Sequence, residues 1–347
     1  MVINKTNRDH FSEWLADTTR QVGAHSAACI RMDNPVLRQS IEANTVQVAD
    51  WLKLEMHGEM GYLKRMLAGK SDPWKTFPFA KSVIVVTFAN RWGDPAATHS
   101  FPPPLNGAPF GYISASARDV DYHRSGQVLL ARLSLLLGEN LHVEATVDTA
   151  AVYERLFAVV GGLGEVGSNT LLRVADSGTS RFFIGCLFID EELPEVIQQP
   201  QIPVSCECCG ICLKNCPTGA IKPGQPIDAR QCISYLTIEK RGVLSQQEAE
   251  LVGDWLFGCD DCTTICPPRV EADRRIPVDL EWLFKTSTAA VRRTIKGSAV
   301  AYAGVTQLRR NGVVVLKNQQ TPQAERLLQW VAENNSSELI RRQIELW

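Results

Sequence analysis

A cluster of cysteines constrains the fold of this chain more than any other feature. Nine of the eleven cysteines in its 347 residues fall between Cys206 and Cys266. The first run, C-x-x-C-x-x-C-x-x-x-C-P, comprises Cys206, Cys209, Cys212 and Cys216. The second run, C-x-x-C-x-x-x-C-P, comprises Cys259, Cys262 and Cys266. Disulfide frameworks spread their cysteines through small secreted chains, so thiols gathered in one segment of a longer chain indicate metal.

The spacing of these thiols favours iron–sulfur clusters over zinc. Short spacing lets one loop wrap a cubane, and in two-cluster ferredoxins the cysteine before proline binds the other cluster. Thiolates are soft ligands that suit iron–sulfur clusters or zinc. Zinc ribbons use paired C-x-x-C knuckles and rarely end in C-x-x-x-C-P. The sequence therefore predicts two [4Fe–4S] clusters, with a pair of zinc sites as the alternative.

Counting ligands assigns the cysteines to two sets. The first predicted set is Cys206, Cys209, Cys212 and Cys266. The second predicted set is Cys216, Cys232, Cys259 and Cys262. Cys232 is taken from outside the two runs because the second run is one cysteine short of the full motif. Cys208 breaks the spacing and is predicted not to bind metal, and Cys29 and Cys186 are predicted to be buried structural thiols.

Alternating apolar segments predict an α/β domain over about residues 1–195. Two largely apolar, β-branched runs, residues 81–90 and 181–190, have the composition of strands buried on both faces. Residues 142–150 are also strand-like. The spacing of apolar residues predicts that residues 1–75 are helical, and it predicts further helices over 123–141 and 152–161.

We expect three structural parts: an α/β domain over 1–197, a cysteine domain over 198–275 and a helical tail over 276–347. From Arg274 onward the chain holds twelve Lys and Arg against six Asp and Glu. Such a surplus is typical of a solvated helical face or of a face that binds a polyanion. The sequence leaves both interpretations of the tail open.

The composition is that of an ordinary globular protein, with 45% hydrophobic and 21% charged residues. The net charge of -2 gives no general attraction to nucleic acid. No run of about 18 apolar residues is present, and residues 1–23 lack a basic segment followed by an apolar one. We therefore expect a cytoplasmic protein without a membrane partner. About 200 residues precede the cysteine module, which exceeds what a simple two-cluster ferredoxin needs, so another group is expected to receive the electrons.

A series of short motifs resembles the epoxyqueuosine reductase family, which is related to the reductive dehalogenases. The cysteine runs and the segment CISYLTIE are highly specific in combination, and the resemblance supports Cys232 as a ligand. The matching segments are MGYL (60–63), KSVIVV (81–86), DYH (121–123), VDTA with ER (147–150, 154–155), GLGxxGxNTLL (162–172), FFIG (182–185), PTGAI (217–221), DARQCISYLTIEKRG (228–242), FGCDDCTTICP (257–267) and RRNGVVVLKN (309–318).

That resemblance implies an α+β protein with a nitroreductase-like α/β core, a ferredoxin-like double [4Fe–4S] module and a C-terminal HEAT-like helical pair. It implies that the core binds cobalamin in its base-off form and that cobalt, reduced through the clusters, removes the epoxide oxygen of epoxyqueuosine in tRNA. The basic tail would contact the tRNA. A one-electron donor such as flavodoxin or ferredoxin is expected, and the protein is expected to be a monomer.

By the same resemblance, Asp148 is the catalytic acid. Expelling an epoxide oxygen as water requires proton delivery, and a carboxylic acid whose pKa is raised by burial is a good donor. From the residues alone, Asp148 fits at least as well as the cap of a helix that begins near Val152. Glycines would let the backbone approach a corrin, and a lone histidine is more often structural. The predicted cofactor-binding residues are Tyr112, Tyr122, His123, Gly162, Gly164, Gly167, Asn169, Thr170, Ser234 and Tyr235.

The chain departs from the family pattern in three places. Ala151 replaces the proline that usually follows VDTA, and residues 113–117 lack the arginine and tyrosine of an ISRYA-like stretch. Residues 165–168 lack the tryptophan and lysine of G-W-x-G-K-N. We expect these departures to lie around the substrate and cofactor pocket. They leave open a paralogous, reductive dehalogenase-like reductase with another substrate, and a non-enzymatic electron-transfer protein.

Overall fold

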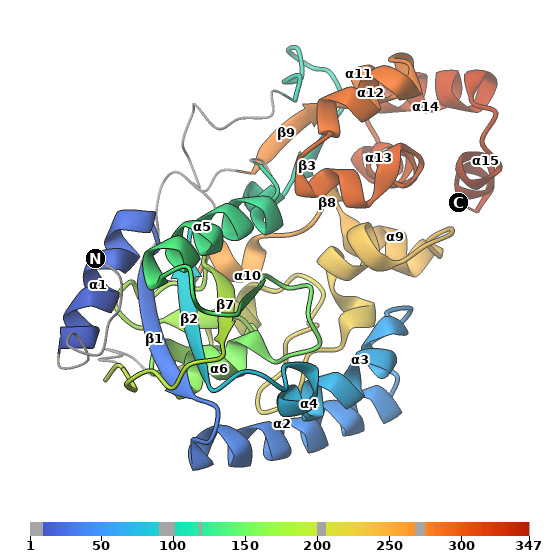
Figure 1. Ribbon diagram of the computed structural model, residues 1–347. Coiled ribbons are helices and arrows are strands. Elements are labelled where there is room, and N and C mark those ends of the chain that lie inside the picture. The colour runs from blue at the N-terminus through green and yellow to red at the C-terminus, as the bar shows by residue number, and fades with distance from the viewer. Residues whose placement is uncertain (1–9, 90–100, 118–119, 200–205, 268–274, 347) are drawn as a thin grey trace.

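A computed structural model describes residues 10–89, 101–117, 120–199, 206–267 and 275–346, without the side chains of residues 207 and 208. Helices cover both faces of a central sheet. The helices of the C-terminal tail lie at the opposite end of the molecule from this sheet (Figure 1). The prediction for Cys208 concerns a side chain outside this description. None of the helices in these ranges is long and apolar enough to cross a membrane.

The central sheet has four strands in the order β1-β2-β7-β4, and every neighbouring pair is antiparallel. The strands are β1 (Ser26–Arg31), β2 (Ser82–Phe88), β4 (Val143–Thr146) and β7 (Phe183–Ile189). All seven residues of β2 are buried, which confirms a strand covered on both faces. Burial on both faces is therefore compatible with an antiparallel sheet as well as with a parallel one.

Strand β1 corrects the prediction that residues 1–75 are all helical. Its sequence, SAACIR, is short and rich in alanine, and it lies between two true helices. Its register pairs Ala28 with Val85 and Cys29 with Ile84. Pairing with the apolar β2 overrides local propensity, because β preference depends on what the strand packs against.

Four helices form the layers on the sheet. On one face α1 (Phe11–Val22) and α5 (Tyr122–Leu137) bury their leucines and Phe11 against β2 and β7. On the other face α2 (Pro35–Lys53) and α6 (Glu154–Val160) pack against Ile30, Val83 and Phe188. The short helices α3 (Tyr62–Ser71) and α4 (Pro73–Thr76) follow α2. Cys29 and Cys186 are fully buried in this core, as predicted.

The cysteine segment folds into short helices and turns. They are α7 (Cys206–Cys209), α8 (Ile211–Asn215), a 3-10 turn (Ala229–Gln231), a π-helix (Tyr235–Glu239), α9 (Gln246–Val252) and α10 (Asp261–Thr264). The π-helix follows Cys232 and Ser234 directly, in the segment CISYLTIE. π-Helices are rare in proteins, and those that occur are frequently found at functional sites.

A second sheet joins segments that are far apart in the sequence. Strand β3 (Phe110–Ile113) lies between β8 (Trp255–Phe257) and β9 (Ile276–Asp279), parallel to the first and antiparallel to the second. These strands come from each of the three expected parts. The division at 197 and 275 stays a prediction, and the second sheet ties all three parts together.

The tail is mostly helical and packs around one buried helix, α13 (Gly304–Gln319), which contacts each of the four other tail helices. The remaining tail elements are α11 (Leu280–Lys285), α12 (Thr288–Ile295), a 3-10 turn (Ala299–Tyr302), α14 (Pro322–Asn334) and α15 (Glu338–Glu345). Helix α13 carries the motif RRNGVVVLKN, and most of its residues are buried.

Part of the basic surplus of the tail faces inward. Arg310 is fully buried and donates to the backbone carbonyls of Leu236 (3.2 Å) and Lys240 (2.7 Å), at the π-helix. Arg309 donates to the carbonyl of Leu283 at 3.0 Å, and Lys317 donates to that of Ile344. Arg309 and Lys317 thus bind backbone within the tail, and Arg310 binds the tail to the π-helix. These three cations therefore do not belong to a solvated or polyanion-binding face.

Candidate active site and cysteine cavity

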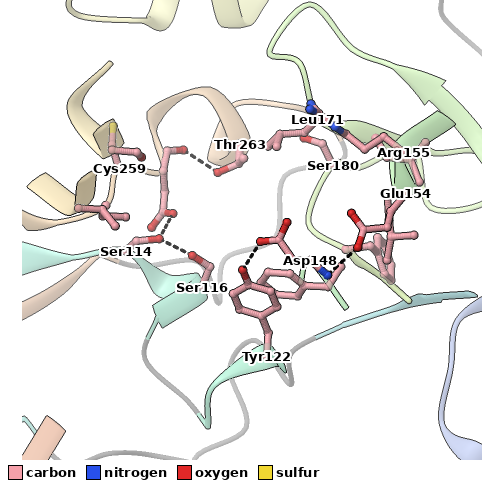
Figure 2. Close-up of a pocket in the computed structure, with 18 of the residues that line it drawn as sticks. Ser114, Ser116, Tyr122, Asp148, Glu154, Arg155, Leu171, Ser180, Cys259 and Thr263 are labelled. Carbon is pink, nitrogen blue, oxygen red and sulfur yellow. Dashed lines mark hydrogen bonds between the residues drawn. The ribbon is translucent and has the colours of Figure 1, made fainter. Parts of the chain in front are cut away.

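The predicted acid lines an open cavity of about 450 Å³, called the large cavity below. It lies where the sheet core meets the cysteine segment, and both contribute to its wall (Figure 2). Its described lining combines an apolar surface with hydroxyl and carboxyl groups. The lining residues are Ser114, Ser116, Tyr122, Asp148, Glu154, Arg155, Leu171, Leu172, Ser180, Phe182, Phe183, Ile184, Ser234, Ile238, Phe257, Gly258, Cys259, Asp260 and Thr263.

Asp148 lies in this wall, two residues beyond the end of β4, and its backbone has the left-handed value φ 54°. Its side chain is 64% exposed, so the burial expected of the catalytic acid is not found. Its Oδ2 accepts a 2.6 Å hydrogen bond from the Tyr122 hydroxyl. Helix α6 begins at Glu154, and no side chain caps its N-terminus at Tyr153. The interpretation of Asp148 as the cap of this helix is therefore wrong.

Tyr122 is held firmly beside Asp148. Its ring stacks on Phe183 at 4.1 Å with 9° between the planes, and His123 stacks on it at 4.1 Å. Burial, followed by the neighbouring Asp148 charge, raises the pKa of Tyr122, so the phenol stays protonated and donates. The imidazole of His123 pairs with Asp121 at 2.7 Å and lies 4.0 Å from Asp148 without lining the cavity.

Glu154 is a second carboxyl in the wall, and the sequence reasoning gave it no role. Its Oε1 accepts the backbone N–H of Asp148 at 2.7 Å (Figure 2). Burial, followed by the Asp148 charge, raises the pKa of Glu154 to about 7, and Lys70 nearby opposes that rise. The only sequence signal was the ER pair that follows VDTA in the family resemblance.

The departure at residues 113–117 lies at the cavity, as expected. Ser114 and Ser116 share a 2.6 Å hydrogen bond, and Ser114 also donates to the buried Asp260. Asp260 accepts the Ala115 N–H at 2.6 Å. Because Asp260 follows Cys259, this contact fixes the serine segment against the cysteine module.

The first predicted cysteine set surrounds a smaller cavity of about 100 Å³. Its four thiols come from α7, α8 and the loop before Pro267, and Cys209 among them is exposed. The departure at 165–168 lies here, because Gly167 and Ser168 line this cavity and the large cavity contains none of residues 165–168. That corrects the expectation that these positions border the substrate pocket. The four cysteines are Cys206, Cys209, Cys212 and Cys266.

The second predicted set is also brought together. Burial raises the pKa of the Cys262 thiol, and the charges of Cys232, Cys212 and Cys216 raise it further. Burial is the main cause of the raised pKa of the Cys259 thiol, and the charges of Cys262 and Cys232 raise that pKa further. Among the described side chains, no three His, Cys, Asp or Glu residues are arranged to hold a single metal ion.

Six of the ten predicted cofactor-binding residues line neither cavity. Tyr235 is buried and its hydroxyl accepts the Glu59 N–H at 2.7 Å, and Tyr112 packs on Trp255. Any Cβ at Gly162 or Gly164 would meet backbone of this chain at 1.9 or 2.1 Å, so these glycines serve close chain packing. Those that line neither cavity are Tyr112, His123, Gly162, Gly164, Thr170 and Tyr235.

The other four predicted residues divide between the two cavities. Tyr122 and Ser234 line the large one. Gly167 and Asn169 line the cysteine cavity, and Asn169 donates to the Cys262 carbonyl at 3.3 Å, which links the two cysteine sets. Thr170 lines neither, although its carbonyl accepts from Arg155 in the wall of the large cavity.

Comparisons of the sequence gave one domain match and close relatives. Residues 205–269 match the family model described as a 4Fe-4S double cluster binding domain. The epoxyqueuosine reductase of Salmonella typhimurium is 33% identical over 295 residues, covering 80% of this chain and 74% of the relative. That of Pseudomonas aeruginosa is 32% identical over 318 residues, covering 85% and 84%.

Comparisons of the structure agree. A crystal structure of an epoxyqueuosine reductase with an epoxyqueuosine-modified tRNA stem loop matches with a TM-score of 0.79 at 21% identity, covering 97% of this chain and 89% of that chain. The enzyme from Streptococcus thermophilus matches with a TM-score of 0.74 at 20% identity, covering 97% and 88%. At these identities the structural likeness establishes a common α+β fold.

Proposed function

This chain belongs to the epoxyqueuosine reductase family, and we propose that it reduces epoxyqueuosine to queuosine in tRNA. It is an oxidoreductase of that family with a 4Fe-4S binding domain. The observation that carries the proposal is one cavity whose wall holds both Asp148 and Cys259. A proton donor and a predicted cluster ligand therefore face the same space.

The large cavity fits a flat, mostly apolar macrocycle with polar substituents. Phe182, Ile238 and Phe257 supply apolar surface, while Ser180 and Ser234 supply hydroxyls. Such a mixture is typical of cofactor sites. These residues would hold cobalamin, which when bound supplies a strongly reducing cobalt centre. The nitroreductase-like core and the HEAT-like tail are part of this proposal.

Asp148 delivers protons to the substrate oxygen. Conversion of an epoxide to an alkene takes a pair of electrons and a pair of protons, and the oxygen leaves as water. Asp148 is exposed to the cavity, where it is free to reach a substrate, and the Tyr122 hydroxyl orients its carboxyl. Glu154 holds the backbone of Asp148 in place and has a pKa near neutrality.

The two cysteine sets are arranged as a relay toward the cavity. Cys209 of the first set is exposed, which suits the arrival of electrons from a donor such as flavodoxin or ferredoxin. Asn169 joins the first set to the second, and Cys259 of the second set reaches the cavity wall. Two [4Fe–4S] clusters held by these sets would supply single-electron transfer along that path.

The substrate and its surroundings complete the proposal. The solved relative was crystallised with a tRNA stem loop. In this chain the exposed cations of the tail, such as Arg292, Arg293 and Arg341, would contact tRNA phosphates. The protein acts as a monomer in the cytoplasm, where its tRNA substrate is found.

The test uses full-length protein reconstituted anaerobically with iron, sulfide and cobalamin. It is given a stem loop containing epoxyqueuosine and a strong reductant, and nucleosides are identified by mass spectrometry. Formation of queuosine supports the proposal. A fully loaded protein that leaves epoxyqueuosine unchanged would contradict it, and a parallel assay with halogenated phenols tests for dehalogenation.

A further inference from the structure

A buried ion pair borders the cavity of the first cysteine set. Strands β5 (Gly164–Val166) and β6 (Leu172–Val174) form a hairpin in which Glu165 lies directly opposite Arg173. Nη1 of Arg173 donates to Oε1 of Glu165 at 3.0 Å. The arginine side chain is only 9% exposed and that of the glutamate 29%, so water screens the pair weakly.

Glu165 bonds directly to the cysteine set, and Arg173 is linked to it through one backbone carbonyl. Arg173 lines the cavity, and its Nε donates to the Gly178 carbonyl at 3.0 Å. The Cys266 thiol lies 4.0 Å from the same carbonyl. Glu165 accepts the backbone N–H of Cys206 at 3.4 Å. The ion pair thus reaches the first and the last cysteine of the set.

Glu165 of this pair lies at a position where the chain departs from the family pattern. The family's G-W-x-G-K-N has tryptophan at the position of Glu165 and lysine at the position of Ser168. In this chain Ser168 lines the cysteine cavity without a charge, and Arg173 brings a cation to that cavity from the neighbouring strand. A carboxylate and a guanidinium therefore stand where the pattern has an indole and an ammonium group.

We propose that the Arg173–Glu165 pair sets the reduction potential of a cluster held by Cys206, Cys209, Cys212 and Cys266. The inference rests on the proposed cluster ligands and not on the tRNA substrate. Reduction adds negative charge to a cluster, so a nearby cation stabilises the reduced form and a carboxylate destabilises it. Arg173 raises the potential and Glu165 lowers it. Arg173 has the larger effect because it alone of the two lines the cavity.

A purely structural role makes a different prediction. If the pair only closes the β5–β6 hairpin, losing either partner loosens the same contact. Both variants would then shift the potential in one direction, or leave it unchanged. Opposite shifts from the two partners of one ion pair require that their charges act on the cluster.

The test is a redox titration of the anaerobically reconstituted full chain, followed by electron paramagnetic resonance, without cobalamin or tRNA. Arg173→Gln is expected to shift the first cluster to lower potential, and Glu165→Gln is expected to shift it to higher potential. The double variant should lie between the two. Arg173→Lys, which keeps the charge, should stay close to wild type.

The matched control is Arg31→Gln, which removes an ion pair with Asp33 at the end of β1, outside the lining of the cysteine cavity. It should leave both clusters unchanged. A Cys232→Ala variant, which lacks a ligand of the second set, assigns the signal of the first cluster. If Arg173→Gln fails to take up iron, Glu165→Gln decides alone. Shifts of equal sign in the two variants, or a Glu165→Gln cluster at wild-type potential, would overturn the inference.

Discussion

The Tyr122 hydroxyl donates a 2.6 Å hydrogen bond to the carboxylate of Asp148, from a ring fixed by stacking on Phe183. Asp148 is otherwise exposed, and its left-handed backbone is held by Glu154. The acid is thus oriented from two sides while one side stays open to the cavity. A positioned proton donor of this kind is what general acid catalysis requires.

Replacement of Asp148 by Asn should abolish most of the proton transfer. We expect queuosine formation to fall by about 10²–10⁴-fold, the usual contribution of a general acid. Asparagine can still accept from Tyr122, so the fold and the iron content should be unchanged. Tyr122→Phe is the companion variant and should have a smaller effect. Single-turnover assays at saturating cofactor measure both, and an active Asp148→Asn enzyme would exclude the assigned role.

Glu154 predicts a dependence of stability on pH. Its folded pKa of about 7 lies above its ordinary value of 4.5, so its contribution is fully present below pH 4.5 and is lost as pH rises toward 7. The loss amounts to about 3 kcal/mol at most. Glu154→Gln keeps an acceptor for the Asp148 N–H and lacks this loss. Thermal melting from pH 4.5 to 8 should show a shallower decline for the variant, and parallel curves would refute the assignment.

The two cysteine sets predict which thiols matter for iron. Ala at Cys216 or Cys232 should remove about half of the iron, because each belongs to one set of four. Cys29→Ala and Cys186→Ala remove fully buried thiols of the sheet core and should leave the iron content unchanged. Iron and sulfide analysis with absorption spectra checks these outcomes. Zinc in place of iron in anaerobic wild-type protein would contradict the cluster assignment.

Gly126 should be intolerant of any side chain. A Cβ at this position of α5 would lie 2.5 Å from the Phe88 ring and 2.8 Å from Val147, the residue before Asp148. Gly126→Ala should therefore destabilise the protein by about 1–3 kcal/mol through overpacking. Gln127→Ala, on the exposed side of the same helix, is the control and should be nearly neutral. Denaturant unfolding compares them, and equal stability of the two variants would count against this packing.

The side chain of Asn311, in the tail, should stabilise the cysteine segment. Its side-chain amide donates to the carbonyls of Thr237 (2.9 Å) and Leu256 (2.8 Å), one in the π-helix and one in β8. Asn311→Ala leaves both buried carbonyls without this donor, at a cost of about 1–3 kcal/mol. Asn334→Ala, on an exposed part of α14, is the control. The variant should melt earlier and release iron faster; unchanged melting would disprove the link.

Local patterns predicted the parts of the structure in which local and tertiary preferences agree. The apolar run of β2 is of this kind, since its composition alone indicates a strand that is buried on both faces. The two sets of four cysteine ligands stay a prediction. Strand β1 was missed because pairing with β2, rather than its alanine-rich sequence, makes it a strand. Arg310 was counted among surface charges because its carbonyl partners lie about 70 residues earlier in the chain.

In the candidate site, too, local motifs predicted some residues, whereas the position of others depends on contacts that are distant in the sequence. Asp148 and Ser234 could be named from motifs, and the structure places both in one wall. The destination of residues 165–168 could not be known, because it depends on a hairpin that folds toward Cys206 rather than toward Asp148. Glu154 was overlooked since its burial is a property of the assembled core.

The small sheet β8-β3-β9 has a consequence for how this protein can evolve and be engineered. Each of its three strands comes from a different region of the gene, and the middle strand has hydrogen bonds to both others. Exchange of the tail or the cysteine segment with that of a relative would leave backbone groups of β3 unpaired unless the new strand matched its register. Chimaeras that join two relatives at a border between these regions are therefore expected to fold poorly. Exchange of the whole chain keeps the three strands matched and is expected to succeed.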